Sequence, residues 1–253
     1  MRYNTLIILI LAALLTGCAS IMGPKVDKER AALHLQIGTG YLSQGMYPQA
    51  MAELQKAEQL DPKSPLILNN VGLSYYVRGK SKQAEAKFRG AVKNDNNYSD
   101  AKNNLARVLL DQGRTAEAIK WLHSVEGDLT YQFPEKTFAN LGMAHFNLGQ
   151  YQKAEDYLLR SLEIRRQNCV TANYYGRTLY ELKRVADSAQ MLDQAVEYCR
   201  PSRFEDPLYF SAMSYFSLGE KEKTRARLEE LLKDYPQSKY VAKAKGMLEL
   251  LEQ

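Results

Sequence analysis

Residues 65–98 read PLILNNVGLSYYVRGKSKQAEAKFRGAVKNDNNY, and the pattern of small and large side chains in this stretch returns along the chain. A small residue marks each copy, at Gly38, Gly72, Ala106, Gly142, Gly176 and Ala212. Successive marks lie 34, 34, 36, 34 and 36 residues apart. Periods of this length are typical of solenoids, in which each copy is one supersecondary unit stacked on its neighbours.

Two further positions repeat in register with the first. Twelve residues after each mark a second small or short side chain follows, as Ala50, Ala84, Ala118, Ala154, Ser188 and Thr224. Sixteen residues after each mark a large side chain follows, as Leu54, Phe88, Leu122, Leu158, Leu192 and Leu228. A turn glycine appears in mid-copy as Gly45, Gly79, Gly113, Gly149 and Gly219, and Lys183 replaces it in the fifth copy.

This pattern resembles the tetratricopeptide repeat, 34 residues folded as two antiparallel helices. The small positions let the two helices approach closely, and glycine ends the first helix in a left-handed conformation. We therefore predict an all-α fold, a right-handed α-solenoid of about six tetratricopeptide helix hairpins plus a C-terminal capping helix. The repeats are placed at 31–64, 65–98, 99–134, 135–168, 169–202 and 205–238, and the capping helix at 239–253.

The first residues have the form of a secretory signal. An apolar run from Leu6 to Leu15 follows Arg2 and is well short of the ~20 residues that span a bilayer, so an uncleaved anchor is the weaker interpretation. Leu15-Thr16-Gly17-Cys18 is similar to the lipobox of bacterial lipoproteins. We expect a signal peptide at 1–17, a diacylglycerol-modified Cys18 and a polar tether over 18–30. By the same resemblance, Ala19 favours an outer-membrane lipid anchor with the protein facing the periplasm.

Composition and motifs argue against an enzyme. The chain has 253 residues, a net charge of +5, three His and three Cys, and no spacing typical of a zinc site. Neither a G-x-S-x-G nor an H-E-x-x-H motif occurs. We expect no catalytic residues, no metal, no cofactor and no small-molecule substrate.

Basic residues gather in the later repeats, at Arg165, Arg166, Arg177, Arg184, Arg200 and Arg203. Most tyrosines fall at packing positions, and a secreted lipoprotein meets little nucleic acid. We interpret the arginines as a solvated or partner-facing edge and expect no nucleic-acid partner.

Two cysteines frame the fifth repeat, Cys169 at its start and Cys199 near its end. These places lie at the same edge of an antiparallel helix pair, and an oxidising periplasm permits a disulfide there. A disulfide between them and two free buried thiols are both compatible with the sequence.

The resemblance to tetratricopeptide repeats implies that the first helix of each repeat lines an inner groove. The groove positions carry apolar and aromatic side chains, amides and two arginines, a composition typical of peptide-binding surfaces. They are Asn69, Leu73, Tyr76, Asn103, Arg107, Leu110, Met143, Phe146, Asn173, Arg177, Tyr180, Tyr209, Met213 and Phe216. Some of them can instead pack between helices. The clamp by which some members hold a chain-terminal carboxylate is missing, which favours an internal segment as ligand.

Several segments narrow the resemblance to one family of lipoproteins. They are Leu33 to Leu42, Gly45 to Ala50, Asn103-Asn104-Leu105, Tyr131 to Pro134 and Asn140-Leu141-Gly142. These segments are similar to the type IV pilus biogenesis and stability lipoproteins, the pilotins of the pilus secretin. The resemblance implies a non-enzymatic scaffold whose protein partner is the pilus secretin and which contacts the membrane through its N-terminal lipid.

Two other functions stay open. Leu231 to Tyr240 is similar to repeats of a lipoprotein of the outer-membrane β-barrel assembly machinery, although repeats 1 and 2 are not. A third hypothesis is an activator of peptidoglycan synthesis, which is also compatible with a repeat scaffold that lacks catalytic residues.

Overall fold

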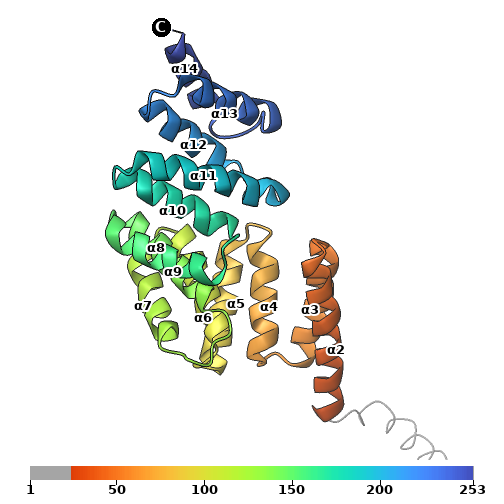
Figure 1. Cartoon of the computed structure of the whole chain (residues 1–253). Coiled ribbons are helices and arrows are strands. Elements are labelled where there is room, and N and C mark those ends of the chain that lie inside the picture. The colour runs from red at the N-terminus through yellow and green to blue at the C-terminus, as the bar shows by residue number, and fades with distance from the viewer. Residues whose placement is uncertain (1–23, 253) are drawn as a thin grey trace, which may run out of the picture. The chain divides into compact units, whose positions relative to one another are not determined.

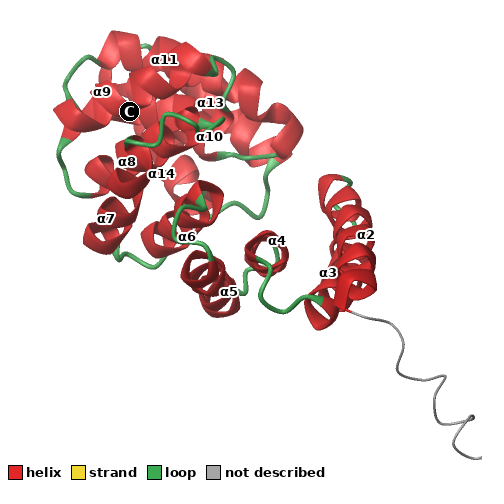
Figure 2. Cartoon of the chain, turned by 90° about the horizontal axis from the view of Figure 1, so that it is seen from below, coloured by secondary structure: helices red, strands yellow, loops and turns green. Residues whose placement is uncertain are grey.

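The computed structural model describes residues 24–252, which form α-helices joined by short turns, with no strand in that range (Figures 1 and 2). The chain divides into two compact units, Met1–Val108 and Leu109–Gln253, and the boundary falls within helix α6 (Ser99–Asp111). The prediction of an all-α tetratricopeptide fold is confirmed, because helix hairpins recur at the predicted period in both units.

The described part of the first unit contains two complete hairpins and most of α6. The hairpins are α2 (Pro24–Ser43) with α3 (Tyr47–Leu60), and α4 (Pro65–Tyr76) with α5 (Ser81–Asn94). A shared apolar core joins them, in which Leu54 of α3 packs with Ile67 and Val71 of α4. Neighbouring hairpins thus bury the faces that one hairpin alone leaves exposed.

The second unit continues through further hairpins. It contains α7 (Thr115–Glu126), α8 (Pro134–Asn147), α9 (Tyr151–Ile164), α10 (Cys169–Glu181), α11 (Val185–Cys199), the 3₁₀ turn η2 (Arg200–Ser202), α12 (Asp206–Ser217), α13 (Lys221–Asp234) and α14 (Val241–Leu251). The two spacings of 36 residues arise in the longer connections after α7 and α11, which contain Gly127-Asp128 and Ser202-Arg203. Helix α14 packs on α13 and buries Ala244 and Leu251, as a capping helix must.

The expected tether is shorter than the sequence suggested. Helix α2 begins at Pro24, so residues 24–30 are helical. No glycine or proline interrupts the chain between Lys25 and Ala31, and Asp27 lies in the favourable first turn, so the first helix extends beyond the repeat boundary. The signal peptide and Cys18 lie outside the described residues. Within 24–252, no helix combines the length and the apolar character needed to cross a membrane.

The repeat's turn requires a left-handed residue, even where glycine is absent. Gly149 has a φ of +70° between α8 and α9, and the following Gln150 N–H donates to the His145 carbonyl at 2.9 Å. Lys183 adopts the same conformation, with a φ of +63°, and the Arg184 N–H donates to the Leu179 carbonyl at 2.9 Å. The stacked hairpins therefore hold Lys183 in a conformation that a side chain with a Cβ disfavours.

Replacing Lys183 by glycine is therefore expected to raise the free energy of unfolding by about 0.5–1 kcal/mol, since relief of the left-handed strain outweighs the extra freedom of the unfolded chain. Chemical denaturation followed by circular dichroism measures this. Lys183→Ala is the matched control, because it removes the same long side chain but keeps the Cβ. Equal stabilities for the two variants would contradict the assignment of strain.

Candidate functional site

In the first unit, the predicted groove residues lie on α4 and α6. Asn69 and Asn103 are buried, and the Asn69 Oδ1 accepts a hydrogen bond from the Asn104 Nδ2 at 2.9 Å. The Asn103 Nδ2 donates to the Ser99 carbonyl at 3.4 Å. These two amides therefore serve the packing of the helices.

Three other predicted residues of this unit keep part of their surface exposed. Leu73, Tyr76 and Arg107 are half-buried. They are the groove residues of the first unit that can contact a partner in this conformation.

In the second unit, the predicted residues divide in the same way. Four of them are buried and therefore pack between helices in this conformation: Leu110, Met143, Asn173 and Tyr209. Four others offer exposed surface, with Phe216 40% exposed and the rest half-buried. These four are Phe146, Arg177, Tyr180 and Phe216, of which Tyr180 also hydrogen-bonds through its hydroxyl to the Ser217 Oγ at 2.9 Å. Met213, also half-buried, packs against the apolar core near α14.

Arg177 of α10 lies among aromatic rings from three first helices. The centre of its guanidinium is 4.8 Å from the ring centroid of Phe146 on α8, 5.1 Å from that of Tyr174 on α10 and 4.1 Å from that of Phe210 on α12. Phe146 and Tyr174 meet edge to face, with centroids 5.4 Å apart. We name these four residues the arginine cluster. Cation–π contacts of this kind hold the guanidinium plane in place while its N–H edges can still bind a ligand.

A second aromatic group adjoins the cluster through Phe210. Tyr209 stacks on Tyr240 with centroids 4.2 Å apart, and Phe210 meets both rings edge to face. Burial, together with the nearby Asp206 carboxylate, raises the pKa of Tyr240 to about 12. The Asp206 carboxylate is itself paired with the Lys239 Nζ at 3.0 Å. Tyr209 and Tyr240 are buried, so only Phe210 of this group keeps part of its ring exposed, and the acidic Asp206 is already paired.

Sequence reasoning missed Tyr174, Phe210 and Tyr240. Tyr174 and Phe210 each follow a predicted groove residue directly, and they occupy the same place in repeats 5 and 6. An aromatic side chain repeated 36 residues apart was the signal that could have identified them. Tyr240 belongs to the segment before the capping helix, where the repeat pattern has ended.

A polar network that joins α11, α12 and α13 was also missed. The Asp193 carboxylate of α11 accepts hydrogen bonds from the Tyr215 hydroxyl at 2.6 Å, the Ser211 hydroxyl at 2.7 Å and the Arg227 Nη2 at 2.9 Å. Burial and the bond to Asp193 raise the pKa of Tyr215 to about 12. Because the network joins α11, α12 and α13, we interpret it as structural.

The three histidines each contact a polar side chain. The Nδ1 atoms of His34, His123 and His145 lie 2.6, 2.9 and 2.7 Å from oxygens of Glu53, Glu126 and Gln150. Within residues 24–252, no three His, Cys, Asp or Glu side chains gather in a way that could hold a metal ion.

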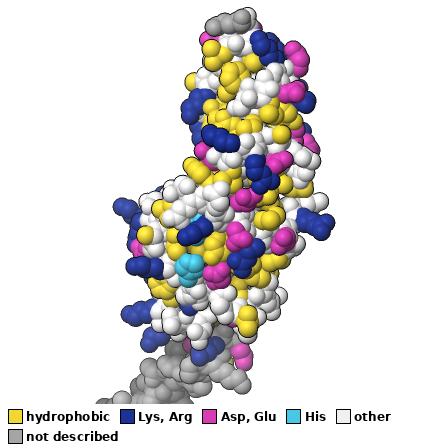
Figure 3. All heavy atoms as spheres, turned by 60° about the vertical axis from the view of Figure 1, so that its left-hand side comes forward, with side chains coloured by type: hydrophobic (Ala, Val, Ile, Leu, Met, Phe, Trp, Pro, Cys, Tyr) yellow, Lys and Arg dark blue, Asp and Glu magenta, His cyan; other side chains and the backbone are white. Residues whose placement is uncertain are grey.

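Charges of both signs are interspersed on the surface. Figure 3 shows Lys and Arg side chains next to Asp and Glu side chains over the face drawn. Of the basic edge predicted in the later repeats, Arg184 pairs with Glu155 and Asp187, and Arg200 with Glu197 and Glu230. These two arginines are part of surface ion pairs, in contrast to Arg177.

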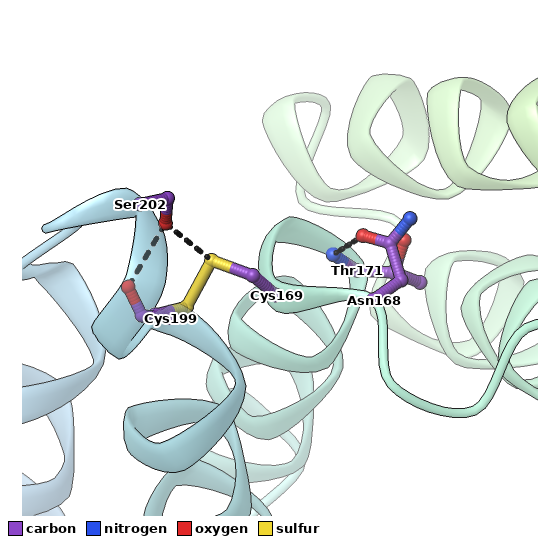
Figure 4. The surroundings of a disulfide bond; sticks show 5 residues. All are labelled: Asn168, Cys169, Thr171, Cys199 and Ser202. Atoms are coloured by element: carbon purple, nitrogen blue, oxygen red, sulfur yellow. Dashed lines mark hydrogen bonds between the residues drawn. A yellow bond between two sulfur atoms is a disulfide. The ribbon is translucent and has the colours of Figure 1, made fainter.

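Cys169 and Cys199 are joined as a disulfide (Figure 4). Asn168 caps α10 next to it, since its side-chain oxygen accepts from the Thr171 N–H at 3.0 Å. On the other side, the Ser202 hydroxyl donates to the Cys199 carbonyl at 2.9 Å. The bridge therefore ties the beginning of α10 to the end of α11.

Comparisons with known proteins agree with this architecture. Models of the tetratricopeptide repeat match residues 38–79, 72–127, 135–168 and 208–238. The type IV pilus assembly protein PilF of Pseudomonas aeruginosa is 28% identical over 199 residues, which cover 76% of this chain and 79% of that protein.

Two solved structures share the fold. A structure of Pseudomonas aeruginosa PilF superposes with a TM-score of 0.72 at 22% identity, covering 87% of this chain and 99% of that one. The crystal structure of PilW, a widely conserved type IV pilus biogenesis factor, superposes with a TM-score of 0.73 at 22% identity, covering 84% of this chain and 97% of that one. The chain is therefore a tetratricopeptide repeat protein and a homologue of the type IV pilus assembly protein PilF.

Proposed function

We propose that this protein is an outer-membrane-anchored scaffold of type IV pilus biogenesis that binds the pilus secretin subunit and promotes its localisation and multimer assembly. Homology to PilF supports the role in pilus biogenesis. The single structural observation that carries protein binding is the arginine cluster, where aromatic surface and an arginine lie together on first helices. Aromatic and arginine side chains dominate the binding energy of protein interfaces.

The proposed mechanism needs no chemistry beyond binding and anchoring. Acyl chains on Cys18 hold the protein at the inner leaflet of the outer membrane, since each buried CH₂ contributes about 0.8 kcal/mol. Tethering raises the effective concentration of the scaffold beside an inserting secretin subunit. The exposed aromatic and arginine side chains then cover apolar surface of that subunit until its neighbours do so.

The test in cells is an immunoblot of the secretin on unboiled membranes. We expect the heat-sensitive multimer to be lost in a deletion strain while β-barrel proteins of the outer membrane stay unchanged. A Cys18→Ala strain is expected to show secretin monomer away from the outer membrane, because the scaffold has lost its anchor. A normal multimer in the deletion strain contradicts the proposal and favours a role in barrel assembly or peptidoglycan synthesis instead.

The test in solution replaces Tyr76, Arg107, Phe146 and Arg177 together by alanine. We expect at least a tenfold loss of secretin binding in a purified pull-down, since each interface hot spot contributes about 2 kcal/mol or more. The matched control replaces four exposed basic residues, Lys63, Lys82, Lys93 and Lys245, by alanine. Circular dichroism checks that both variants stay helical. If the fourfold alanine variant binds the secretin with wild-type affinity, these residues do not form the binding surface and the proposal is falsified.

A further inference from the structure

Arg177 differs from the other half-buried arginines of the second unit. Each of the others in the described range 109–252 pairs with a carboxylate, as in Arg160–Glu126, Arg225–Glu252 and Arg227–Asp193. In the same range no carboxylate pairs with Arg177, whose contacts are the rings of the arginine cluster. A half-buried guanidinium that has no carboxylate partner keeps N–H groups that can donate hydrogen bonds to a ligand.

A second unpaired polar group lies on the same face of α10. Asn173 precedes Arg177 by one helical turn and is 0% exposed. Neither its side-chain oxygen nor its nitrogen has a hydrogen-bond partner among the described residues. Buried amides are nearly always hydrogen-bonded. Because Asn173 is fully buried behind this face, a ligand reaches the Arg177 guanidinium and not this amide.

The surroundings define the chemistry of that ligand. The walls are the rings of Phe146, Tyr174 and Phe210, which favour apolar neighbours. The Lys243 Nζ lies 6.0 Å from the Tyr209 ring centroid, so a second cation borders the adjoining aromatic group. The acidic Asp206 beside that group is paired with Lys239. The charge that complements this face is negative.

We propose that the arginine cluster binds an Asp or Glu side chain of a partner protein, within a segment whose neighbouring side chains are apolar. The carboxylate accepts two parallel hydrogen bonds from the Arg177 guanidinium, the geometry in which arginine binds carboxylates best. The flanking apolar side chains pack on the rings. This inference rests on the proposed function only in taking this face as a protein-binding surface, and it adds what the surface selects.

The test uses peptides, so that it does not depend on the secretin. A random dodecapeptide library is panned on the purified full-length protein. We expect the selected peptides to carry Asp or Glu beside Phe, Leu or Met. Arg177→Met should weaken their binding about tenfold to a hundredfold, the range for a charge-assisted hydrogen bond lost from a partly buried site. Arg225→Met, which removes a half-buried arginine of the same unit that pairs with Glu252, should change binding less than twofold.

A double-mutant cycle makes the contact specific. Changing the peptide's Glu to Gln should weaken binding to the wild-type protein as much as Arg177→Met does, and should have little further effect on that variant. Arg177→Lys keeps the positive charge but loses the two parallel N–H donors of the guanidinium. Its affinity for the peptide should lie between those of the wild-type protein and Arg177→Met, and its melting temperature should match that of the wild type. Neutral or basic selected peptides, no selected peptide, or additive effects in the cycle would overturn the proposal.

The outcomes separate the two proposals. Acidic peptides that depend on Arg177, with no binding of the secretin, leave this inference standing and reject the proposed partner. Secretin binding that Arg177→Met does not weaken supports the proposed function and rejects this inference.

Discussion

Replacing Cys169 and Cys199 together by serine is expected to lower the free energy of unfolding of the second unit by roughly 3–4 kcal/mol, the chain-entropy effect of closing a loop of about 30 residues. The structure joins these residues across the edge of the α10–α11 hairpin, 30 positions apart. Denaturant titration of the wild-type and variant proteins measures the change. Hydrogen exchange of the α10 and α11 amides assigns it to this unit, because a chain of two units need not unfold in one step.

The reduced wild-type protein is the matched control for that variant. Treatment with a reductant should lower its stability to that of the double-serine protein, and should raise the mass of the native protein by about two hydrogens per bridge. A wild-type protein whose mass and stability are the same before and after reduction would show that the two thiols are not joined in the native protein.

Replacing Gly142 by alanine is expected to destabilise the protein by about 1–3 kcal/mol, the usual cost of overpacking. A Cβ at this position would lie 2.5 Å from the Cγ and 2.7 Å from the Cδ2 of Leu158, and 3.2 Å from the Leu158 backbone nitrogen. The branching carbon and the backbone cannot move aside as the end of a flexible side chain can. Helices α8 and α9 must therefore separate, and thermal unfolding measures the loss.

Gly246→Ala provides the matched control for this change. Gly246 also lies inside a helix, α14, but apart from its chain neighbours and the adjacent backbone of that helix no atom lies within 4 Å of the Cβ that alanine would add. Alanine should therefore stabilise there by about 0.5–1 kcal/mol, because it favours the helix more than glycine does. Adding Leu158→Ala to Gly142→Ala should cost less than the sum of the single changes, since the small side chain relieves the overlap. Two additive effects would contradict the close approach.

The repeat positions were predictable because they depend on the distance between two helices of one hairpin. Glycine sixteen residues before a leucine, as in Gly142 and Leu158 or Gly176 and Leu192, identifies that contact from sequence alone. The turn was equally predictable, even at Lys183, since the period requires a helix to end there whatever residue is present. The helical start at Pro24 was missed because no repeat partner marks those residues.

The candidate site was predictable only in part. Repeat position placed Phe146 and Arg177 on first helices, but it also placed Asn173 and Met143, which are buried. Whether a side chain at such a position is exposed depends on the size of its neighbours in the adjacent repeats. The ring of Phe210, 4.1 Å from the guanidinium of Arg177 and 33 residues later in sequence, is one such neighbour.

The sequence by itself determined the all-α repeat architecture, because each repeat encodes its own hairpin through local spacing of small, large and turn residues. It also indicated a lipoprotein signal, which lies outside the described residues. Only the tertiary structure decided which half-buried arginine of the described range 109–252 has no carboxylate partner and which rings surround it, because those contacts join successive repeats. It also decided between paired and separate sulfurs at Cys169 and Cys199, since that depends on how the ends of α10 and α11 meet.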